Sequence, residues 1–134
     1  MKIRMIILFV SLIVGYSNFS NGETVDPSIQ MSIKPAEKLK TSFVCMMNNK
    51  HFATEQIPVE VNGKMYYGCC QGCVESLKNN RAIRYAIDPY SGEEVDKADA
   101  YIVLNSDGSQ NVLYFKSEEN YLNFVKNKGK KNNS

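Results

Sequence analysis

Residues 57–73 decide the fold of this chain, because they join a hairpin to a cysteine cluster: Ile57-Pro58-Val59-Glu60-Val61-Asn62-Gly63-Lys64-Met65-Tyr66-Tyr67-Gly68-Cys69-Cys70-Gln71-Gly72-Cys73. Residues 57–61 alternate apolar and polar side chains, as a half-buried strand does. Asn62-Gly63 predicts a two-residue turn, since both residues tolerate a positive φ. Residues 64–67 form the returning strand, and a helix is expected from about Gln71 to Asn80.

Three of the four cysteines close this stretch, and 23 residues separate the fourth, Cys45, from Cys69. Gly68 is expected to let the chain turn sharply into Cys69, Cys70 and Cys73. Thiolates at such spacing can converge on one soft metal ion, because a knuckle supplies two or three sulfurs and a second segment supplies another. All four cysteines are therefore candidate metal ligands.

Two neighbouring side chains are further candidates. Thiolates suit Cu(I) and Zn(II), and a thioether adds a preference for Cu(I). Met46 directly follows Cys45, and His51 is the sole histidine. The alternatives are that Met46 fills a gap in the core and that His51 is a surface residue.

A disulfide framework is the main alternative for the thiols. Four cysteines allow three pairings. If the protein is secreted, disulfides can form, because compartments outside the cytoplasm are oxidising. Geometry disfavours a Cys69–Cys70 bridge, whereas Cys45 could pair with any of the other three. Clustering at one knuckle favours a metal site, and oxidation would abolish binding.

The sequence favours a binding protein over an enzyme. A Cys–His nucleophile pair would need Cys45 or Cys69 near His51 and an orienting group, and no local motif supports one. The run from Cys70 to Cys73 is a C-x-x-C, but a hairpin precedes it, and the βαβ pattern of a thioredoxin-like fold is missing.

The second half of the chain follows the same plan. Strands are expected at 101–104 and 111–115, with a turn at 105–109 between them. Ser117 is a good N-cap for a following helix. The predicted fold is thus a small α+β domain of two β-hairpin-plus-helix units, the first with a zinc-knuckle-like cysteine cluster.

The two units suggest an internal repeat, although a chance recurrence is the alternative. When Tyr66-Tyr67 is set on Tyr114-Phe115, Cys69 falls on Ser117. In this alignment the second unit is a thiol-free copy.

The N-terminus has the pattern of a secretory signal. Lys2 and Arg4 precede an apolar run from Met5 to Val14 that is too short to span a bilayer, and cleavage is expected after Ser20 or Gly22. An uncleaved anchor is the alternative. We expect a periplasmic or secreted protein with no stable membrane anchor after cleavage.

The predicted organisation is a signal peptide at 1–22, a flexible linker at 23–40, a metal-binding domain at 41–126 (units 41–80 and 81–126) and a disordered basic tail at 127–134. The whole chain carries 16 basic and 14 acidic residues. Lys2 and Arg4 are the only charged residues of the signal, so the mature chain has 14 of each and is neutral. A neutral chain gives no electrostatic reason to expect a nucleic-acid partner.

The run Val44-Cys45-Met46-Met47, together with residues 62–73, resembles the TRASH and YHS families of small metal-binding domains. These families pair an early Cys, often followed by Met, with a hairpin that ends in a Tyr-Tyr/Phe-x-Cys-x3-Cys knuckle and a helix. The resemblance covers about 43–77, and the second half is similar to a thiol-free YHS unit. Such domains are associated with heavy-metal sensing, trafficking and resistance.

The resemblance implies that Cys45, Cys69 and Cys73 are the ligands, with Cys70 an additional thiol. The interval between Cys45 and Cys69 is slightly longer than usual, which leaves open which three or four sulfurs bind. The implied function is extracytoplasmic binding of Cu(I) or Zn(II) as a carrier, buffer or resistance accessory. Similar proteins of Bacteroidetes-like bacteria occur beside metal efflux systems, which suggests such a partner. The alternative is a disulfide-stabilised or thiol-redox envelope protein that acts as an interaction module.

Overall fold

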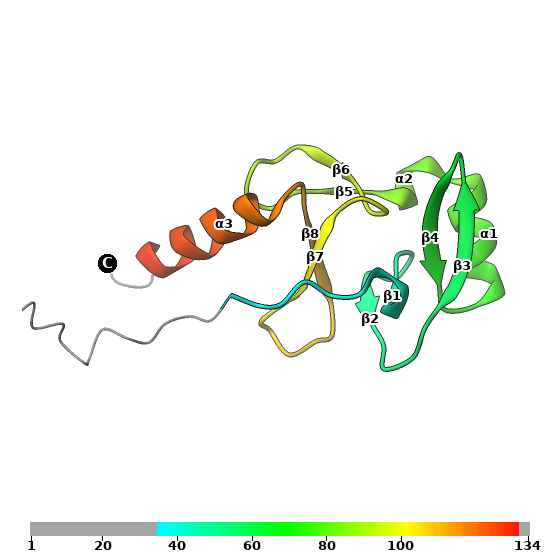
Figure 1. The fold of residues 1–134 in the computed structure, drawn as a ribbon, viewed down its shortest axis with the longest axis horizontal. Helices are drawn as coiled ribbons and strands as arrows, with labels where there is room; N and C mark the ends of the chain where they lie inside the picture. Colours follow the sequence, from blue (N-terminus) through cyan, green and yellow to red (C-terminus); the bar gives the residue numbers. More distant parts are fainter. Residues whose placement is uncertain (1–34, 132–134) are drawn as a thin grey trace, which may run out of the picture. The chain divides into compact units, whose positions relative to one another are not determined.

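The computed structural model describes residues 35–131, so the predicted signal peptide and residues 23–34 of the predicted linker lie outside the described residues. Figure 1 shows the arrangement of the elements. Their order is η1 (Thr41–Phe43), β1 (Val44–Cys45), β2 (Lys50–His51), β3 (Ile57–Val61), β4 (Lys64–Gly68), α1 (Gln71–Asn79), α2 (Arg81–Arg84), β5 (Tyr85–Ile87), β6 (Glu94–Asp96), β7 (Tyr101–Leu104), β8 (Val112–Phe115) and α3 (Glu118–Lys131). In the described part of the chain the strands form four antiparallel hairpins. The predicted α+β class is confirmed.

The hairpin β3–β4 forms as the sequence predicts. Val61 pairs with Lys64, which leaves a two-residue loop of Asn62 and Gly63. Both loop residues have a positive φ, 53° and 76°, the backbone conformation that Asn-Gly favours. Two residues separate the end of β4 from helix α1, which packs against both strands.

The β1–β2 hairpin was not predicted, and it joins the first half of the domain to the second. Its turn, residues 46–49, ends at Asn49 with a φ of 55°. Lys50 forms an isolated bridge with Asn111, and the Val112 N–H donates to the Asn49 carbonyl over 2.9 Å. The strand that carries the first cysteine is therefore hydrogen-bonded, through its hairpin, to the start of β8.

The hairpin β7–β8 and helix α3 occupy the predicted places. The Asn120 backbone N–H donates to Ser117 Oγ over 3.2 Å, as expected of an N-cap.

Helix α3 is longer than predicted, because it continues through residues 127–131 of the expected tail. The Lys128 ammonium lies 4.7 Å from the centre of the Phe124 ring, so an aromatic contact supports this extra turn. The remaining tail, residues 132–134, lies outside the described residues.

The β5–β6 turn is built around Asp88, whose carboxylate is fully buried. It accepts hydrogen bonds from the backbone N–H groups of Tyr90, Ser91 and Lys116, and from the Asn120 amide, over 2.7–3.2 Å. Burial raises the pKa of Asp88, but these donors outweigh burial and hold it below its ordinary value. The carboxylate thus ties the β5–β6 turn to the start of α3.

One apolar core spans both halves. Its buried members are Val44, Met46, Val59, Tyr66, Val74, Leu77, Val95, Ala100, Ile102, Val112 and Tyr114. A second cluster is formed by Val103, Phe115 and Tyr121. Since Ile102 and Val103 are neighbours on β7, successive side chains of this strand enter different clusters. The two predicted units therefore share a core and do not have one each.

The bounds of the elements give two offsets between the halves. β4 and β8 end 47 positions apart, and α1 and α3 begin 47 positions apart, whereas β4 and β8 begin 48 positions apart. The predicted alignment has the offset of 48 and places Tyr66 on Tyr114, and both of these side chains are buried in the same core. The alignment of the two units stays a prediction. Lys116 and Asn120, at the start of the second helix unit, donate to the buried Asp88 carboxylate.

The end of the predicted linker packs on the domain. The Ala36 N–H donates to the Tyr121 hydroxyl over 2.5 Å, and the Leu39 N–H donates to the Ile102 carbonyl over 2.8 Å. Leu39 also packs against the core. Residues 35–40 therefore belong to the folded domain, because two apolar side chains bring them onto it.

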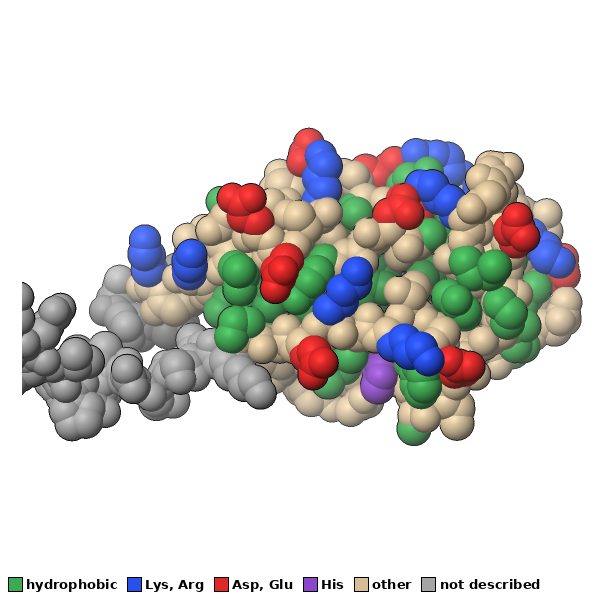
Figure 2. All heavy atoms as spheres, viewed as in Figure 1, with side chains coloured by type: hydrophobic (Ala, Val, Ile, Leu, Met, Phe, Trp, Pro, Cys, Tyr) green, Lys and Arg blue, Asp and Glu red, His purple; other side chains and the backbone are tan. Residues whose placement is uncertain are grey.

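Charged side chains of both signs are interspersed on the face that Figure 2 shows. A basic patch of the kind that binds nucleic acid is not present on that face. Among residues 35–131, no helix combines the length and apolarity needed to cross a membrane.

Candidate metal centre

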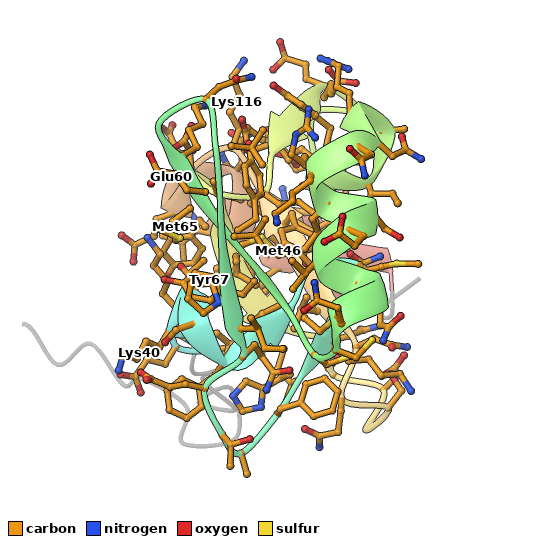
Figure 3. All side chains as sticks on the ribbon, turned by 90° about the vertical axis from the view of Figure 1, so that its right-hand side faces the viewer. Lys40, Met46, Glu60, Met65, Tyr67 and Lys116 are labelled. Atoms are coloured by element: carbon orange, nitrogen blue, oxygen red, sulfur yellow. The ribbon has the colours of Figure 1, made fainter. Side chains whose placement is uncertain are left out.

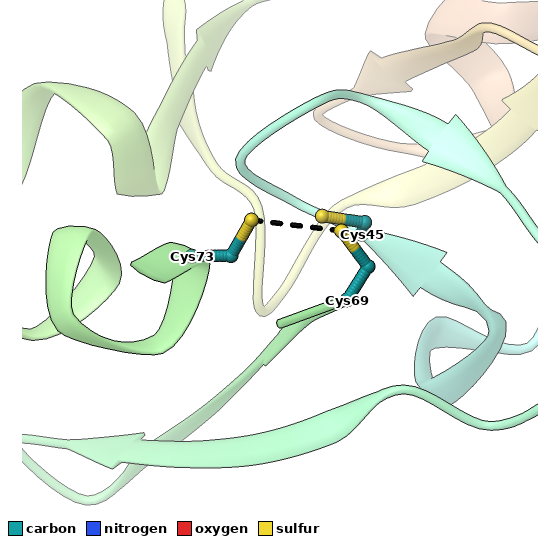
Figure 4. Close-up of side chains that lie close together, drawn as sticks. All are labelled: Cys45, Cys69 and Cys73. Atoms are coloured by element: carbon teal, nitrogen blue, oxygen red, sulfur yellow. Dashed lines mark hydrogen bonds between the residues drawn. The ribbon is translucent and has the colours of Figure 1, made fainter. Parts of the chain in front are cut away.

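Three thiols from three separate parts of the fold meet at one point (Figure 4). Cys45 ends β1, Cys69 follows β4, and Cys73 lies in the first turn of α1. Their sulfur atoms all lie within 4.8 Å of one another. The sulfurs of Cys69 and Cys73 are 3.6 Å apart. The structure thus groups three of the four predicted ligands, two of them buried and Cys69 exposed.

Backbone N–H groups surround the Cys45 thiol. They belong to Asn48, Cys69 and Met47. Burial raises the pKa of Cys45, but these N–H groups outweigh burial and lower the pKa below its ordinary value. The turn after β1 therefore favours the thiolate, which is the form that binds a metal.

Cys69 and Cys73 hold their protons more tightly. The Asn48 side-chain amide donates to Cys69 Sγ over 3.4 Å. Burial and the hydrogen bond with Cys45 nevertheless raise the pKa of Cys69. Burial and the hydrogen bonds with Cys70 and Cys69 raise the pKa of Cys73 to about 12. A metal ion must displace these protons, so binding should depend on pH.

Gly68 makes the close approach of Cys73 possible. A Cβ at Gly68 would lie 2.9 Å from the Cβ of Cys73, a distance that real Cβ atoms essentially never show. Gly68 is not among the residues with a positive φ. The bends at Cys69 and Cys70 that follow it therefore do not need the conformational freedom of glycine, and glycine is required here for the space between β4 and α1.

Cys70 lies beside the group of three. It is exposed and is the N-cap of α1, and its sulfur is 3.3 Å from that of Cys73. Hydrogen bonds from the Cys73 backbone and thiol, and from the Gly72 backbone, lower the pKa of Cys70. Cys70 does not belong to the set of mutually close sulfurs. It is placed to act as a fourth ligand after a side-chain rotation or as a redox partner of Cys73.

The donor set fits a soft ion. Zinc–thiolate bonds are about 2.3 Å long, so tetrahedral ligand sulfurs lie roughly 3.8 Å apart. The sulfur separations here, 3.6 Å and at most 4.8 Å, need only small shifts to reach that geometry. Sulfur ligands suit Cu(I) and Zn(II) and do not suit hard cations such as Mg²⁺.

Of the two weaker candidates, Met46 is a core residue and His51 lies outside the thiol group. Met46 is fully buried in the core. In Figure 3 its side chain lies between the β3–β4 hairpin and helix α1. His51 pairs with Val44 across β1–β2, and its ring stacks on Phe43. Since Cys45 is the next residue after Val44, its side chain leaves the opposite face of the hairpin from that of His51. His51 is accordingly not part of the thiol group.

Sequence reasoning missed two buried polar residues, Lys97 and Tyr114. Lys97 donates hydrogen bonds to the turn that follows Cys45, and its ammonium lies 5.2 Å from the centre of the Tyr114 ring. Burial lowers the pKa of Lys97 to about 8, and the charge of Cys45 acts in the opposite direction. Burial and the same charge raise the pKa of Tyr114. Neither residue could be recognised from the sequence. A lysine is expected to be exposed, and Tyr114 lies in a segment that looks like an ordinary core strand.

Comparison of the chain with protein-family models, with curated proteins and with solved structures finds no match. The resemblance to TRASH and YHS domains therefore rests on the residues quoted for it, and the function must be argued from the thiols themselves.

Proposed function

We propose that this protein binds one thiophilic metal ion, Cu(I) or Zn(II), through Cys45, Cys69 and Cys73. The observation that carries the proposal is the convergence of three sulfurs, from three elements, within 4.8 Å. Thiolates are favourable ligands for both ions, and Cys70 supplies a fourth sulfur for tetrahedral zinc. A three-sulfur site without it suits the low coordination number of Cu(I).

The role that fits this site is that of a carrier, buffer or resistance accessory, not that of a catalyst. Cys69 and Cys70 are exposed, so an ion could enter or leave by exchange with thiols of another protein. His51, the only histidine, lies outside the thiol group. The signal-like N-terminus supports a periplasmic or secreted location, and the family resemblance supports a metal efflux system as the partner.

A titration of reduced protein under anaerobic conditions tests this function. Cu(I) or Zn(II) should bind at one ion per chain, in competition with a chelator of known affinity. Binding should also protect three or four thiols from alkylation. Binding weaker than micromolar for both ions would rule the function out.

The alternative is a thiol-redox or disulfide-stabilised protein, which the 3.3 Å separation of Cys70 and Cys73 favours. Thiols should be counted in protein isolated without reductant. Four reactive thiols that added metal protects support the metal site. Disulfides that resist mild reductant support the alternative.

A further inference from the structure

Lys97 is a buried cation without a carboxylate partner. Its side chain comes from the segment after β6 and is only 4 % exposed. The ammonium donates to the Met46 carbonyl and to Asn49 Oδ1, both at 2.7 Å. Both acceptors are neutral. No Lys97 ion pair occurs among the described residues. A buried charge left in this state is unfavourable unless an anion forms nearby.

Tyr114 supplies a second, independent anomaly at the same place. Its hydroxyl is the one buried side-chain polar atom among residues 35–131 that has no hydrogen-bond partner. The Lys97 ammonium lies 5.2 Å from the centre of the Tyr114 ring. A buried hydroxyl without a partner is rare, and in the metal-free structure no acceptor among the described residues, Cys45 Sγ included, lies within hydrogen-bonding reach of it.

Lys97 is hydrogen-bonded to the turn that directly follows Cys45, and its ammonium lies near the Tyr114 ring. The turn that carries the acceptors of Lys97, residues 46–49, is the turn that supplies N–H groups to Cys45. We propose that the thiol-free half supplies the outer shell of the metal centre. In this shell Lys97 is the counter-charge of the metal–thiolate complex, and the Tyr114 hydroxyl, unpartnered in the metal-free protein, donates a hydrogen bond to Cys45 Sγ once the metal has drawn the thiolates together.

The inference rests on the proposed function and adds a charge balance to it. Four thiolates with Zn(II), or three thiolates with Cu(I), carry two net negative charges. One buried ammonium halves the charge of either complex. This outer shell also assigns a task to the half of the domain that has no cysteine.

Replacement of Lys97 by methionine tests the counter-charge, because methionine keeps the length of the side chain and removes the charge. The Zn(II) affinity of Lys97→Met, measured by chelator competition, should be weaker by about ten- to 100-fold than that of the wild type. The matched control is Lys64→Met, since Lys64 already pairs with Asp96 and Asp99. Its affinity should stay within about threefold of wild type.

A spectroscopic readout separates this role from a merely structural one. Loss of a positive charge raises the energy of the sulfur electrons. The thiolate-to-metal charge-transfer band of the Co(II)-substituted Lys97→Met protein should therefore move to lower energy. An unchanged band together with wild-type affinity would overturn the counter-charge.

Tyr114→Phe tests the same shell without the removal of a charge. The metal-free variant should unfold at the same denaturant concentration as the wild type or a higher one, because the lost hydroxyl had no partner. Its metal affinity should nevertheless fall severalfold. An unchanged affinity would overturn the hydrogen bond to Cys45. If the wild-type protein binds no metal, the proposed function is wrong. If the wild type binds metal and the variants bind it with the same affinity, only the outer shell is wrong.

Discussion

The thiols of the site differ in how readily they lose a proton, and the cause lies in their immediate neighbours. Backbone N–H groups lower the pKa of Cys45 and of Cys70. Burial and neighbouring thiols raise the pKa of Cys69 and of Cys73. A thiophilic ion would therefore displace a proton more easily from Cys45 and Cys70 than from Cys69 and Cys73.

Single replacements by serine should separate the three grouped cysteines from the fourth. Cys45→Ser, Cys69→Ser and Cys73→Ser should each cost most of the metal affinity, at least about 100-fold, since each removes one sulfur from the group. Cys70→Ser should cost less, because its sulfur lies outside the group. Chelator competition with Zn(II) and Cu(I) measures the effect. A protein that loses binding on Cys70→Ser but keeps it on Cys69→Ser would contradict the assignment.

The raised pKa of Cys73 predicts an alkaline loss of stability in the metal-free protein. The folded state holds this proton up to about pH 12, whereas an unfolded cysteine loses it near pH 8.5. Its contribution is therefore fully present below the unfolded pKa and is lost as the pH rises through the window between the two values. The free energy of unfolding should fall more steeply in this window for the wild type than for Cys73→Ser. The free energy of unfolding is measured with urea at a series of pH values. If it falls equally steeply in the wild type and in Cys73→Ser, the Cys73 thiol does not cause the alkaline loss of stability.

Some site residues could be found from the sequence and others could not. The spacing of Cys45, Cys69 and Cys73 identified the thiols, because ligand knuckles leave a short local pattern. It could not exclude His51, whose direction depends on the register of a two-residue strand. Lys97 was invisible, since its position beside a thiol depends on contacts between residues some 50 positions apart in the chain.

At the scale of elements, the junction between β4 and α1 positions two of the three grouped thiols. Gly68→Ala would place a Cβ 2.9 Å from the Cβ of Cys73. This overpacking should cost roughly 1–3 kcal/mol of stability and weaken metal binding, because α1 must move away from β4. Urea unfolding and metal titration of the same samples measure both effects.

Gly72→Ala is the matched control for this junction. The nearest atom to a Cβ at Gly72 is Cys70 Sγ, at an ordinary 3.9 Å. Since Gly72 lies inside α1, alanine should stabilise the helix by about 0.5–1 kcal/mol. The two substitutions should therefore change stability in opposite directions. Equal effects would mean that space at Gly68 does not matter.

Elements with strong local signals were predicted, and short ones were missed. The Asn-Gly turn predicted β3–β4, and Ser117 marked the start of α3. The strands β1, β2, β5 and β6 are two or three residues long, too short for a hydrophobic period to be visible. They form because tertiary contacts hold them, such as the buried carboxylate of Asp88 in the β5–β6 turn.

At the scale of the whole molecule, the second half supports the first through a shared core and through its own polar centre. Asp88→Ala would leave four N–H donors without their acceptor. The free energy of unfolding should fall by about 3 kcal/mol. Because the pKa of Asp88 is lowered, its contribution is full above about pH 4 and is lost at lower pH. The exposed Asp107→Ala control should cost less than about 1 kcal/mol, and a comparable loss would contradict this role for Asp88.

X-ray absorption of the metal-loaded protein tests the central claim most directly, namely that one ion is held by thiols from three parts of the fold. With Zn(II) or Cu(I) at one equivalent, the metal should have three or four sulfur neighbours at about 2.3 Å. In Cys45→Ser the number of sulfur neighbours should fall by one. A first shell made of nitrogen and oxygen, or one that the loss of Cys45 leaves unchanged, would contradict the account.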